Sequence, residues 1–364
     1  MSTLQTLDAH IARGTAPGIV VAAGSVDGPV ETFAAGDLSA DAIVRIQSMT
    51  KPILAVATLQ LVQAGRLTLD DPVETWLPEL ADRRVLRTPE SPLSDTMAAT
   101  PITVRHLLTN TSGYGATTAP SPLQDAMREN RTDAGAEPVA MGAQDWLDAM
   151  ASLPLMFQPG AGWRYHHSFG ILGILLSRVV DASLDDHLRQ RLFDPLGMVD
   201  TGHVVPREKA HRLPAAYRHD QERGLVEVEP AGAGFYVEPA PFDLSHAELV
   251  STAADYAEFA LMLASGGRHR GRPFLDPELV EQLRTDQVPA AIKTPDSFIF
   301  PGFWKGTGWG LGVAVVTEGE HAGRYGWSGG QGTDFFINPD GSFRILLTQV
   351  EMGPQIMELF GNLQ

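Results

Sequence analysis

The sequence predicts an α/β protein of the α+β type, in which one antiparallel sheet is assembled from both ends of the chain. Short apolar runs bounded by turn residues occur near the N-terminus and again after residue 300. The long apolar stretches with helical character lie between these two regions. The turn residues of Asn338–Gly341 separate two of the C-terminal runs, as expected in an antiparallel meander. The predicted architecture is a sheet flanked by helices, with an inserted and mostly helical region.

The expected strands fall into two groups. Gly18–Ala23 is rich in β-branched and small apolar residues, and Val30–Ala34 follows a turn at Asp27-Gly28, so we expect a hairpin. The C-terminal strands are expected at Gly310–Val316, Gly323–Trp327, Thr333–Ile337 and Phe343–Val350.

The longest expected helix is apolar on most of its faces, which is typical of a buried helix. It begins near Ser48 and ends at Ala64-Gly65. Residues 202–247 have weak periodicity and many Gly, Pro and His residues, so we expect long loops there. We predict a discontinuous α/β domain over residues 1–75 and 245–364, around a mostly helical domain over residues 76–244. The other expected helices are Arg105–Thr109, Ala143–Ser152, Gly170–Val180, Ser251–Ser265 and Met352–Leu363.

Composition excludes several classes of function. The chain of 364 residues carries 44 acidic and 27 basic side chains, a net charge of −17, which repels the phosphates of nucleic acids. It has no cysteine, which excludes a thiol nucleophile, Cys-ligated zinc and disulfides. The apolar stretches Ile19–Ala23 and Gly170–Ser177 are too short for a signal segment and a membrane span respectively. We therefore expect a cytoplasmic protein that acts on a small molecule, with no nucleic-acid or membrane partner and no cofactor. The oligomeric state is not defined by the sequence.

The first of two serine motifs is Ser48-Met49-Thr50-Lys51. Positions three apart share one face of a helix, so the Lys51 amine can approach the Ser48 hydroxyl and serve as its base. Pro52 belongs in the first turn of a helix, which places Ser48 at the positive end of the helix dipole. Burial in the apolar helix favours the neutral, basic form of Lys51. The alternative is that Ser48 only caps the helix and Lys51 lies at the surface.

The second serine motif, Gly326–Gly330, matches the G-x-S-x-G nucleophile elbow of α/β-hydrolases. That elbow precedes a helix, whereas Thr333–Ile337 has the pattern of a strand. The last histidine, His321, precedes Ser328, so the usual chain order of Ser, acid and His is not met. We favour a Gly-rich bend into a strand, or a wall of the Ser48 site.

The stretch Ile46–Pro52 resembles the S-x-x-K box of the β-lactamase-related serine hydrolases, which include class C β-lactamases, D,D-peptidases and family VIII carboxylesterases. This resemblance implies a class C β-lactamase-like fold. Other stretches resemble the same family in the same order along the chain, namely Gly65–Val73, Ile102–Gly113, Pro195–Met198 and Leu249–Tyr256.

The resemblance also implies roles for Tyr165 and His167. Tyr165 stands at the tyrosine of the family's Y-x-N box, where a phenol beside a lysine relays protons. His167 replaces the usual asparagine, so it is the expected substrate-binding residue of this box. His166 and His167 are adjacent rather than four residues apart, so we expect no metal site.

Trp327-Ser328-Gly329 stands at the family's third motif, usually K-T-G, and resembles the Trp-Gly-Gly-like version of its esterases. The resemblance implies that these three residues bind substrate, with an apolar indole in place of a cation. It also implies that the backbone N–H groups of Ser48 and Gly330 form the oxyanion hole.

These observations predict a serine carboxylesterase that cleaves esters through an acyl-enzyme on Ser48, with Lys51 and Tyr165 as general base and acid. An acyltransferase or amidase with the same site is the first alternative. A β-lactamase or D,D-peptidase is another, since both belong to the same family. A catalytically silent binding protein of this fold is the alternative from a different class.

Overall fold

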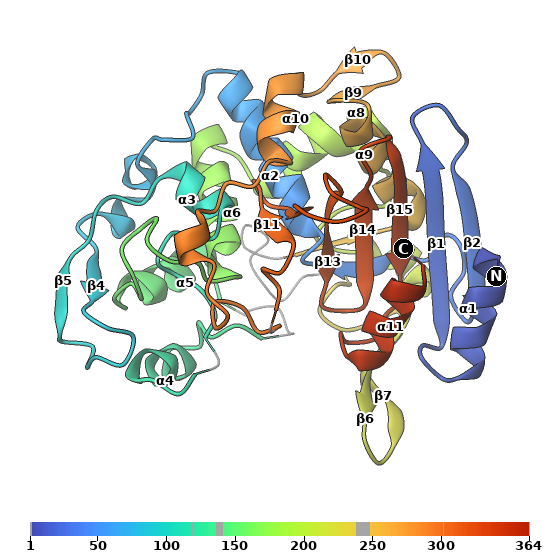
Figure 1. Ribbon diagram of the computed structural model, residues 1–364, viewed down its shortest axis with the longest axis horizontal. Coiled ribbons are helices and arrows are strands. Elements are labelled where there is room, and N and C mark those ends of the chain that lie inside the picture. Colours follow the sequence, from blue (N-terminus) through green and yellow to red (C-terminus); the bar gives the residue numbers. More distant parts are fainter. Residues whose placement is uncertain (1, 118, 136–140, 238–247, 301, 364) are drawn as a thin grey trace.

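A seven-stranded antiparallel sheet forms one side of the molecule (Figure 1). The computed structural model describes residues 2–117, 119–135, 141–237, 248–300 and 302–363. The strand order is β11-β12-β13-β14-β15-β1-β2. The bounds are β1 Gly18–Ser25, β2 Glu31–Gly36, β11 Thr307–Trp309, β12 Ala314–Val316, β13 Tyr325–Gly329, β14 Thr333–Ile337 and β15 Ser342–Leu347. The prediction of one sheet built from both ends of the chain is confirmed.

The two ends of the chain meet where β15 pairs with β1, with Val20 opposite Leu347. Alternate residues of β1 face opposite sides of the sheet, and both sides are apolar. Ile19 packs on one face with helices α1 (Thr3–Ala12) and α11 (Pro354–Asn362). Val20 packs on the other face, where α9 (Ala253–Ala264) contacts β1 and β15. Because both faces are covered, β1 is a nearly continuous apolar run.

Figure 1 shows the helical region beside the sheet, with α2 between the two regions. This arrangement agrees with the predicted inserted helical region, while the limits of the two domains stay a prediction. The α-helices there and around the sheet are α2 Thr50–Gln63, α3 Val104–Leu108, α4 Pro122–Glu129, α5 Ala143–Ala151, α6 His167–Val180, α7 Leu184–Leu188, α8 Asp194–Leu196, α9 Ala253–Ala264 and α10 Pro277–Leu283. Short 3₁₀ turns occur at Val73–Thr75, Pro78–Leu80, Arg207–Arg212 and Ala290–Ile292, and a π-helical segment at Arg189–Phe193.

Within the described residues, four small two-stranded sheets accompany the large one. They pair β3 Val44–Gln47 with β8 Leu249–Ser251, β4 Arg84–Leu86 with β5 Thr96–Ala98, β6 Ala216–Asp220 with β7 Gly224–Glu229, and β9 Arg268–His269 with β10 Arg272–Pro273.

The β6–β7 hairpin corrects the expectation of loops over residues 202–247. Most of its residues are exposed or half-buried, so no strict apolar alternation marks the two strands. Only occasional side chains, such as Tyr217 and Leu225, pack on the core beside α1 and α11. Residues 238–247 of the same stretch lie outside the described residues.

Within the described ranges, no single helix has both the length and the apolar composition to cross a membrane. One pair of helical segments meets those criteria only when the two are taken together. The segments are His167–Val180 and Leu184–Leu196, and the chain bends by 78° between them.

Candidate active site

Ser48 lies in a tight turn between strand β3 and helix α2. The turn contains Ser48 and Met49, and α2 begins at Thr50, slightly later than expected. Gln47, just before the turn, has a φ of 49°, an uncommon conformation for a residue other than glycine. Such local strain is often found at functional sites. Ser48 is half-buried, whereas nearly all of α2 behind it is buried.

The Lys51 amine lies inside the protein and contacts the Ser48 hydroxyl. Lys51 Nζ is 2.9 Å from Ser48 Oγ, and Lys51 is 3 % exposed. The three-residue spacing therefore brings the two side chains together, as expected from a shared helical face. The structure does not place Lys51 at the surface, which was the alternative.

Glu248 is a third member of this cluster that sequence reasoning missed. Its Oε1 atom is 3.1 Å from Lys51 Nζ and 3.3 Å from Ser48 Oγ. The pairing of β3 with β8 explains this position, because Gln47 lies opposite Leu249 and the strands are antiparallel. Ser48, which follows Gln47, is thereby brought opposite Glu248, which precedes Leu249. Glu248 lies outside the recognised motifs, and strands of three or four residues carry too little periodicity to predict their pairing.

Glu248 changes the expected charge of Lys51. Burial lowers the pKa of Lys51, as anticipated, but charge on Tyr165 and Glu248 and the hydrogen bonds to both outweigh burial and raise the pKa overall. Near neutral pH, where the phenol is uncharged, the Glu248 carboxylate is the charged neighbour that favours the ammonium form. The expectation of a neutral amine is wrong for the resting protein. Lys51 is an ammonium group that donates to both Ser48 and Glu248.

Tyr165 is held beside this cluster by Trp327. The indole Nε1–H of Trp327 donates to the Tyr165 hydroxyl at 2.6 Å. Lys51 Nζ is 4.9 Å from the centre of the Tyr165 ring. Burial raises the pKa of Tyr165 above its usual value, against the lowering effect of Lys51, so the phenol is neutral at neutral pH. Trp327, expected as a wall for substrate, instead positions the phenol and packs against Trp309, with ring centres 4.7 Å apart.

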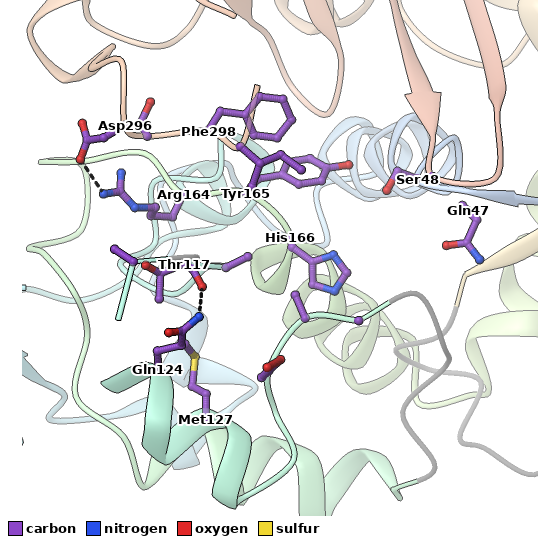
Figure 2. A pocket seen from close by; sticks show the side chains of 18 of the residues that line it. Gln47, Ser48, Thr117, Gln124, Met127, Arg164, Tyr165, His166, Asp296 and Phe298 are labelled. Atoms are coloured by element: carbon purple, nitrogen blue, oxygen red, sulfur yellow. Dashed lines mark hydrogen bonds and ion pairs between the residues drawn. The ribbon is translucent and has the colours of Figure 1, made fainter. Parts of the chain in front are cut away.

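A cavity of about 760 Å³ opens in front of Ser48 and Tyr165. Figure 2 shows the Tyr165 hydroxyl directed toward Ser48, and His166 lines the same cavity. Gly330 and Gln331 also line this space. The cavity therefore brings together the expected nucleophile, the expected phenol and both residues expected to form the oxyanion hole, Ser48 and Gly330.

The charged side chains at the outer wall of the cavity form ion pairs. Arg164 Nη2 lies 3.2 Å from Asp296 Oδ2, as Figure 2 shows. Arg128 Nε lies 3.5 Å from Asp133 Oδ2. Each arginine of the lining thus has a carboxylate beside it.

The Tyr box directs His166 rather than His167 to the cavity. His166 has a φ of 97° and precedes α6, so the chain turns sharply before the helix begins at His167. His167 is 2 % exposed, has its Nε2 atom 2.6 Å from the carbonyl oxygen of Thr132, and stacks on Trp146. The structure therefore places His167 behind the cavity wall, away from the substrate-binding position expected for it. In the described part of the chain, no group of three or more His, Asp or Glu residues is placed to hold a metal ion.

The second serine motif lies within the sheet. Ser328 is the penultimate residue of β13, directly opposite Asp334 of β14, and its hydroxyl donates to Asp334 Oδ1 at 2.7 Å. Gly329 is required by packing, because a Cβ there would collide with the carbonyl oxygen of Ile46 and the hydroxyl of Thr333. Of residues 327–330, Gly330 is the one that lines the cavity.

The fold and this site together define the β-lactamase-like class of proteins. The family model described as Beta-lactamase matches residues 5–352, and the chain belongs to that family.

Several known proteins resemble the chain over most of its length. Protein Rv1367c of Mycobacterium tuberculosis (strain ATCC 25618 / H37Rv) is 35% identical over 328 residues, which cover 87% of this chain and 79% of that protein. Esterase EstB of Burkholderia gladioli is 30% identical over 328 residues, 84% of this chain and 77% of that protein. The solved structure of EstCE1, described as a hydrolase with promiscuous acyltransferase activity, has a TM-score of 0.78 at 22% identity and covers 98% of this chain and 96% of its own. This last similarity shows the shared fold.

Proposed function

We propose that this protein is a serine carboxylesterase that cleaves carboxylic esters through an acyl-enzyme on Ser48. The observation that carries the proposal is the 2.9 Å contact between Lys51 Nζ and Ser48 Oγ at the edge of an open cavity. A serine hydroxyl needs such a neighbouring group to become a nucleophile. Membership of the Beta-lactamase family and the similarity to esterase EstB support hydrolase chemistry.

In the proposed reaction, Ser48 Oγ attacks the ester carbonyl carbon and its proton passes to a basic group of the cluster. The backbone N–H groups of Ser48 and Gly330 stabilise the oxyanion of the tetrahedral intermediate. The bond to the alcohol then breaks, and the Tyr165 hydroxyl donates a proton to the leaving oxygen. Water repeats the sequence on the acyl-enzyme and releases the carboxylic acid.

The charge distribution favours neutral substrates. Recognition of the carboxylate of a β-lactam or a peptide terminus requires an available cation. The cavity arginines, Arg128 and Arg164, are engaged with Asp133 and Asp296. The Glu248 carboxylate beside Ser48 repels a second anion. Uncharged acyl and alcohol groups therefore fit this site better than anionic ones.

A hydrolysis screen tests the proposal. Wild-type protein is assayed with p-nitrophenyl esters of increasing acyl length and, in parallel, with the β-lactam nitrocefin. We expect a much higher kcat/KM for at least one ester than for nitrocefin, and loss of ester turnover in Ser48→Ala. Equal turnover of nitrocefin and a short ester would contradict the assignment to ester hydrolysis.

Acyl transfer to an alcohol is the second candidate. The favouring observation is the size of the cavity, about 760 Å³, which leaves room for an acceptor alcohol beside a bound acyl group. Transfer requires no additional nucleophile, because the acceptor takes the place of water. Adding a small alcohol to the ester assay and measuring the ratio of new ester to free acid separates the two reactions.

A further inference from the structure

The Glu248 carboxylate reaches both members of the serine–lysine pair with a single oxygen. Oε1 is 3.3 Å from Ser48 Oγ and 3.1 Å from Lys51 Nζ, and the third side of this triangle is the 2.9 Å Ser48–Lys51 contact. The Glu248 side chain is 21% exposed and the Lys51 side chain 4%. The carboxylate thus lies between the buried ammonium and the cavity, next to the atom that would attack a substrate.

The positions of the protons in this triangle follow from the chemistry of the three groups. An ammonium group only donates, an ionised carboxylate only accepts, and a serine hydroxyl has one hydrogen. The Lys51 amine lies 3.1 Å from the Glu248 carboxylate, and its pKa is raised, so it is protonated and has no lone pair for another proton. The Ser48 hydroxyl donates to Glu248 Oε1 and accepts from Lys51. In the resting site, the group poised to receive the Ser48 proton is therefore Glu248.

We propose that Glu248 is a further catalytic residue, which accepts the Ser48 proton during acylation while the protonated Lys51 stabilises the negative charge that develops on Oγ. This inference rests on the proposed function, in which Ser48 is the nucleophile. Glu248 would be the group that takes the Ser48 proton, a step that the proposed function does not assign to either Lys51 or Tyr165.

The proton transfers balance over acylation. As the bond from Oγ to the acyl carbon forms, the Ser48 O–H bond breaks and Glu248 becomes a neutral carboxyl group. When the bond to the alcohol breaks, the leaving oxygen takes the Tyr165 proton and leaves a phenolate. Lys51 passes a proton to that phenolate and takes the proton held by Glu248. The end state has acylated Ser48, a free alcohol, and Glu248, Lys51 and Tyr165 in their starting forms.

A purely electrostatic role for Glu248 predicts the opposite effect of removing its charge. If Glu248 only kept Lys51 protonated, Glu248→Gln would let burial favour the neutral, basic amine. Ser48 would then become a better nucleophile. If Glu248 is the base, the same change removes the proton acceptor and slows acylation. The sign of the change in rate therefore distinguishes the two roles.

The test measures Ser48 acylation in two ways, by the rate of fluorophosphonate labelling and by the burst phase with p-nitrophenyl acetate. We expect Glu248→Gln to slow acylation by about 10²–10⁴-fold, the usual contribution of a general base. Glu79→Gln is the matched control, because Glu79 has a similarly exposed side chain, 19%, and is ion-paired with Arg178. We expect this control to acylate at the wild-type rate. Thermal unfolding confirms that each variant is folded.

A second pair of variants covers the case in which Glu248→Gln does not fold. Glu248→Asp and Glu248→Asn have equal length and differ in charge, and we expect the former to acylate at least tenfold faster. Equal rates in this pair, or a wild-type or faster rate in folded Glu248→Gln, would overturn the assignment of Glu248 as the base.

Failure of the proposed function gives a different result. Labelling that depends on Glu248, without turnover of any ester by the wild type, would refute the esterase proposal and support the role of Glu248. Wild-type protein that neither labels nor turns over esters would overturn both.

Discussion

Two segments of the molecule carry a serine in a motif typical of nucleophiles, and the structure gives them different surroundings. Ser48 lies in a turn at the edge of the cavity, 2.9 Å from the Lys51 ammonium. Ser328 lies within β13 and donates to Asp334, which is itself held by Arg344 at 2.7 Å. Both hydroxyls donate to a carboxylate that is ion-paired with a cation. Ser48 differs in that it also contacts its cation, Lys51, directly and lines the cavity.

The comparison shows that a short motif defines a local chain path but not a reactive group. The glycines around Ser328 allow close packing, since a Cβ at Gly329 would collide with the backbone of Ile46. In the nucleophile elbow of an α/β-hydrolase, the same G-x-S-x-G motif places the serine on a sharp turn that precedes a helix. Here a second strand follows, and the serine side chain points across a strand pair to Asp334.

The largest expected effect separates the two serines directly. We expect Ser48→Ala to abolish fluorophosphonate labelling and to lower kcat by about 10⁶-fold, as for other serine nucleophiles. Ser328→Ala should still label and should keep most of its turnover, because Ser328 lies in β13 and is not among the residues that line the cavity. Digestion and mass spectrometry of the labelled wild type should locate the adduct on the peptide that contains Ser48. An adduct on Ser328 would reverse the comparison.

Removal of Lys51 tests whether the cation beside Ser48 is required for the activity of this serine. We expect Lys51→Ala to lower kcat nearly as much as Ser48→Ala, because groups that act as one unit are not additive. The change also leaves Glu248 without the cation that lies 3.1 Å from it. Activity is measured on the best ester, with folding checked by circular dichroism. Retention of more than about a tenth of wild-type activity would contradict a role for Lys51, since acid–base groups contribute about 10²–10⁴-fold.

A matched lysine variant shows whether the loss is specific. Lys209 pairs with Asp200 at 2.7 Å, away from the residues that line the cavity. We expect Lys209→Ala to keep wild-type turnover.

A smaller effect is expected from removing the Tyr165 hydroxyl, which is directed toward Ser48. Tyr165→Phe deletes one hydroxyl and keeps the ring, so we expect the fold to survive and kcat to fall by about 10²-fold or more. The measurement is kcat on the same ester together with the thermal midpoint. Near-normal hydrolysis would reduce Tyr165 to a packing residue.

Trp327→Phe is the comparison variant for Tyr165. It removes the 2.6 Å hydrogen bond to the phenol but leaves the hydroxyl in place. A hydrogen bond contributes about 0.5–1.5 kcal/mol, so the expected loss is about tenfold at most. A larger loss in Trp327→Phe than in Tyr165→Phe would mean that Trp327 supports the site by more than its hydrogen bond to Tyr165, for example through its packing against Trp309.

The sequence could predict the parts of this molecule that depend on continuous apolar runs and on spacing within one helix. The sheet was predictable because β1, β14 and β15 are apolar over most of their length. The Ser48–Lys51 contact was predictable because three residues make almost one helical turn. Both features are local, so they can be read from neighbouring residues.

The missed parts depend on contacts between distant segments or on single backbone angles. Glu248 reaches Ser48 through the pairing of two very short strands that are about 200 residues apart in sequence. The cavity is lined by His166 and not by the expected His167, because His166 has a φ of 97°, which histidine rarely adopts. The protonated form of Lys51 was not predictable for the same reason as the position of Glu248, because Glu248, which together with Tyr165 raises the pKa of Lys51, comes from this distant segment.

The smallest expected effect concerns stability and completes the comparison of the two serines. Ser328→Ala removes a 2.7 Å hydrogen bond to Asp334, and Ser48→Ala removes contacts of 2.9 Å with Lys51 and 3.3 Å with Glu248. In each variant the neighbouring ion pair stays intact, Arg344–Asp334 or Lys51–Glu248. Hydrogen bonds to charged groups contribute about 1.5–3 kcal/mol. Because Ser328 is half-buried and Arg344 still holds Asp334, we expect the lower end for Ser328→Ala, a loss of about 1.5 kcal/mol in the free energy of unfolding. Ser48→Ala should lose less than this, since active-site groups are often retained at a cost in stability. Urea unfolding of both variants and the wild type measures the difference. A greater loss of stability in Ser48→Ala than in Ser328→Ala would show that the serine at the cavity, and not the one in the sheet, supports the fold.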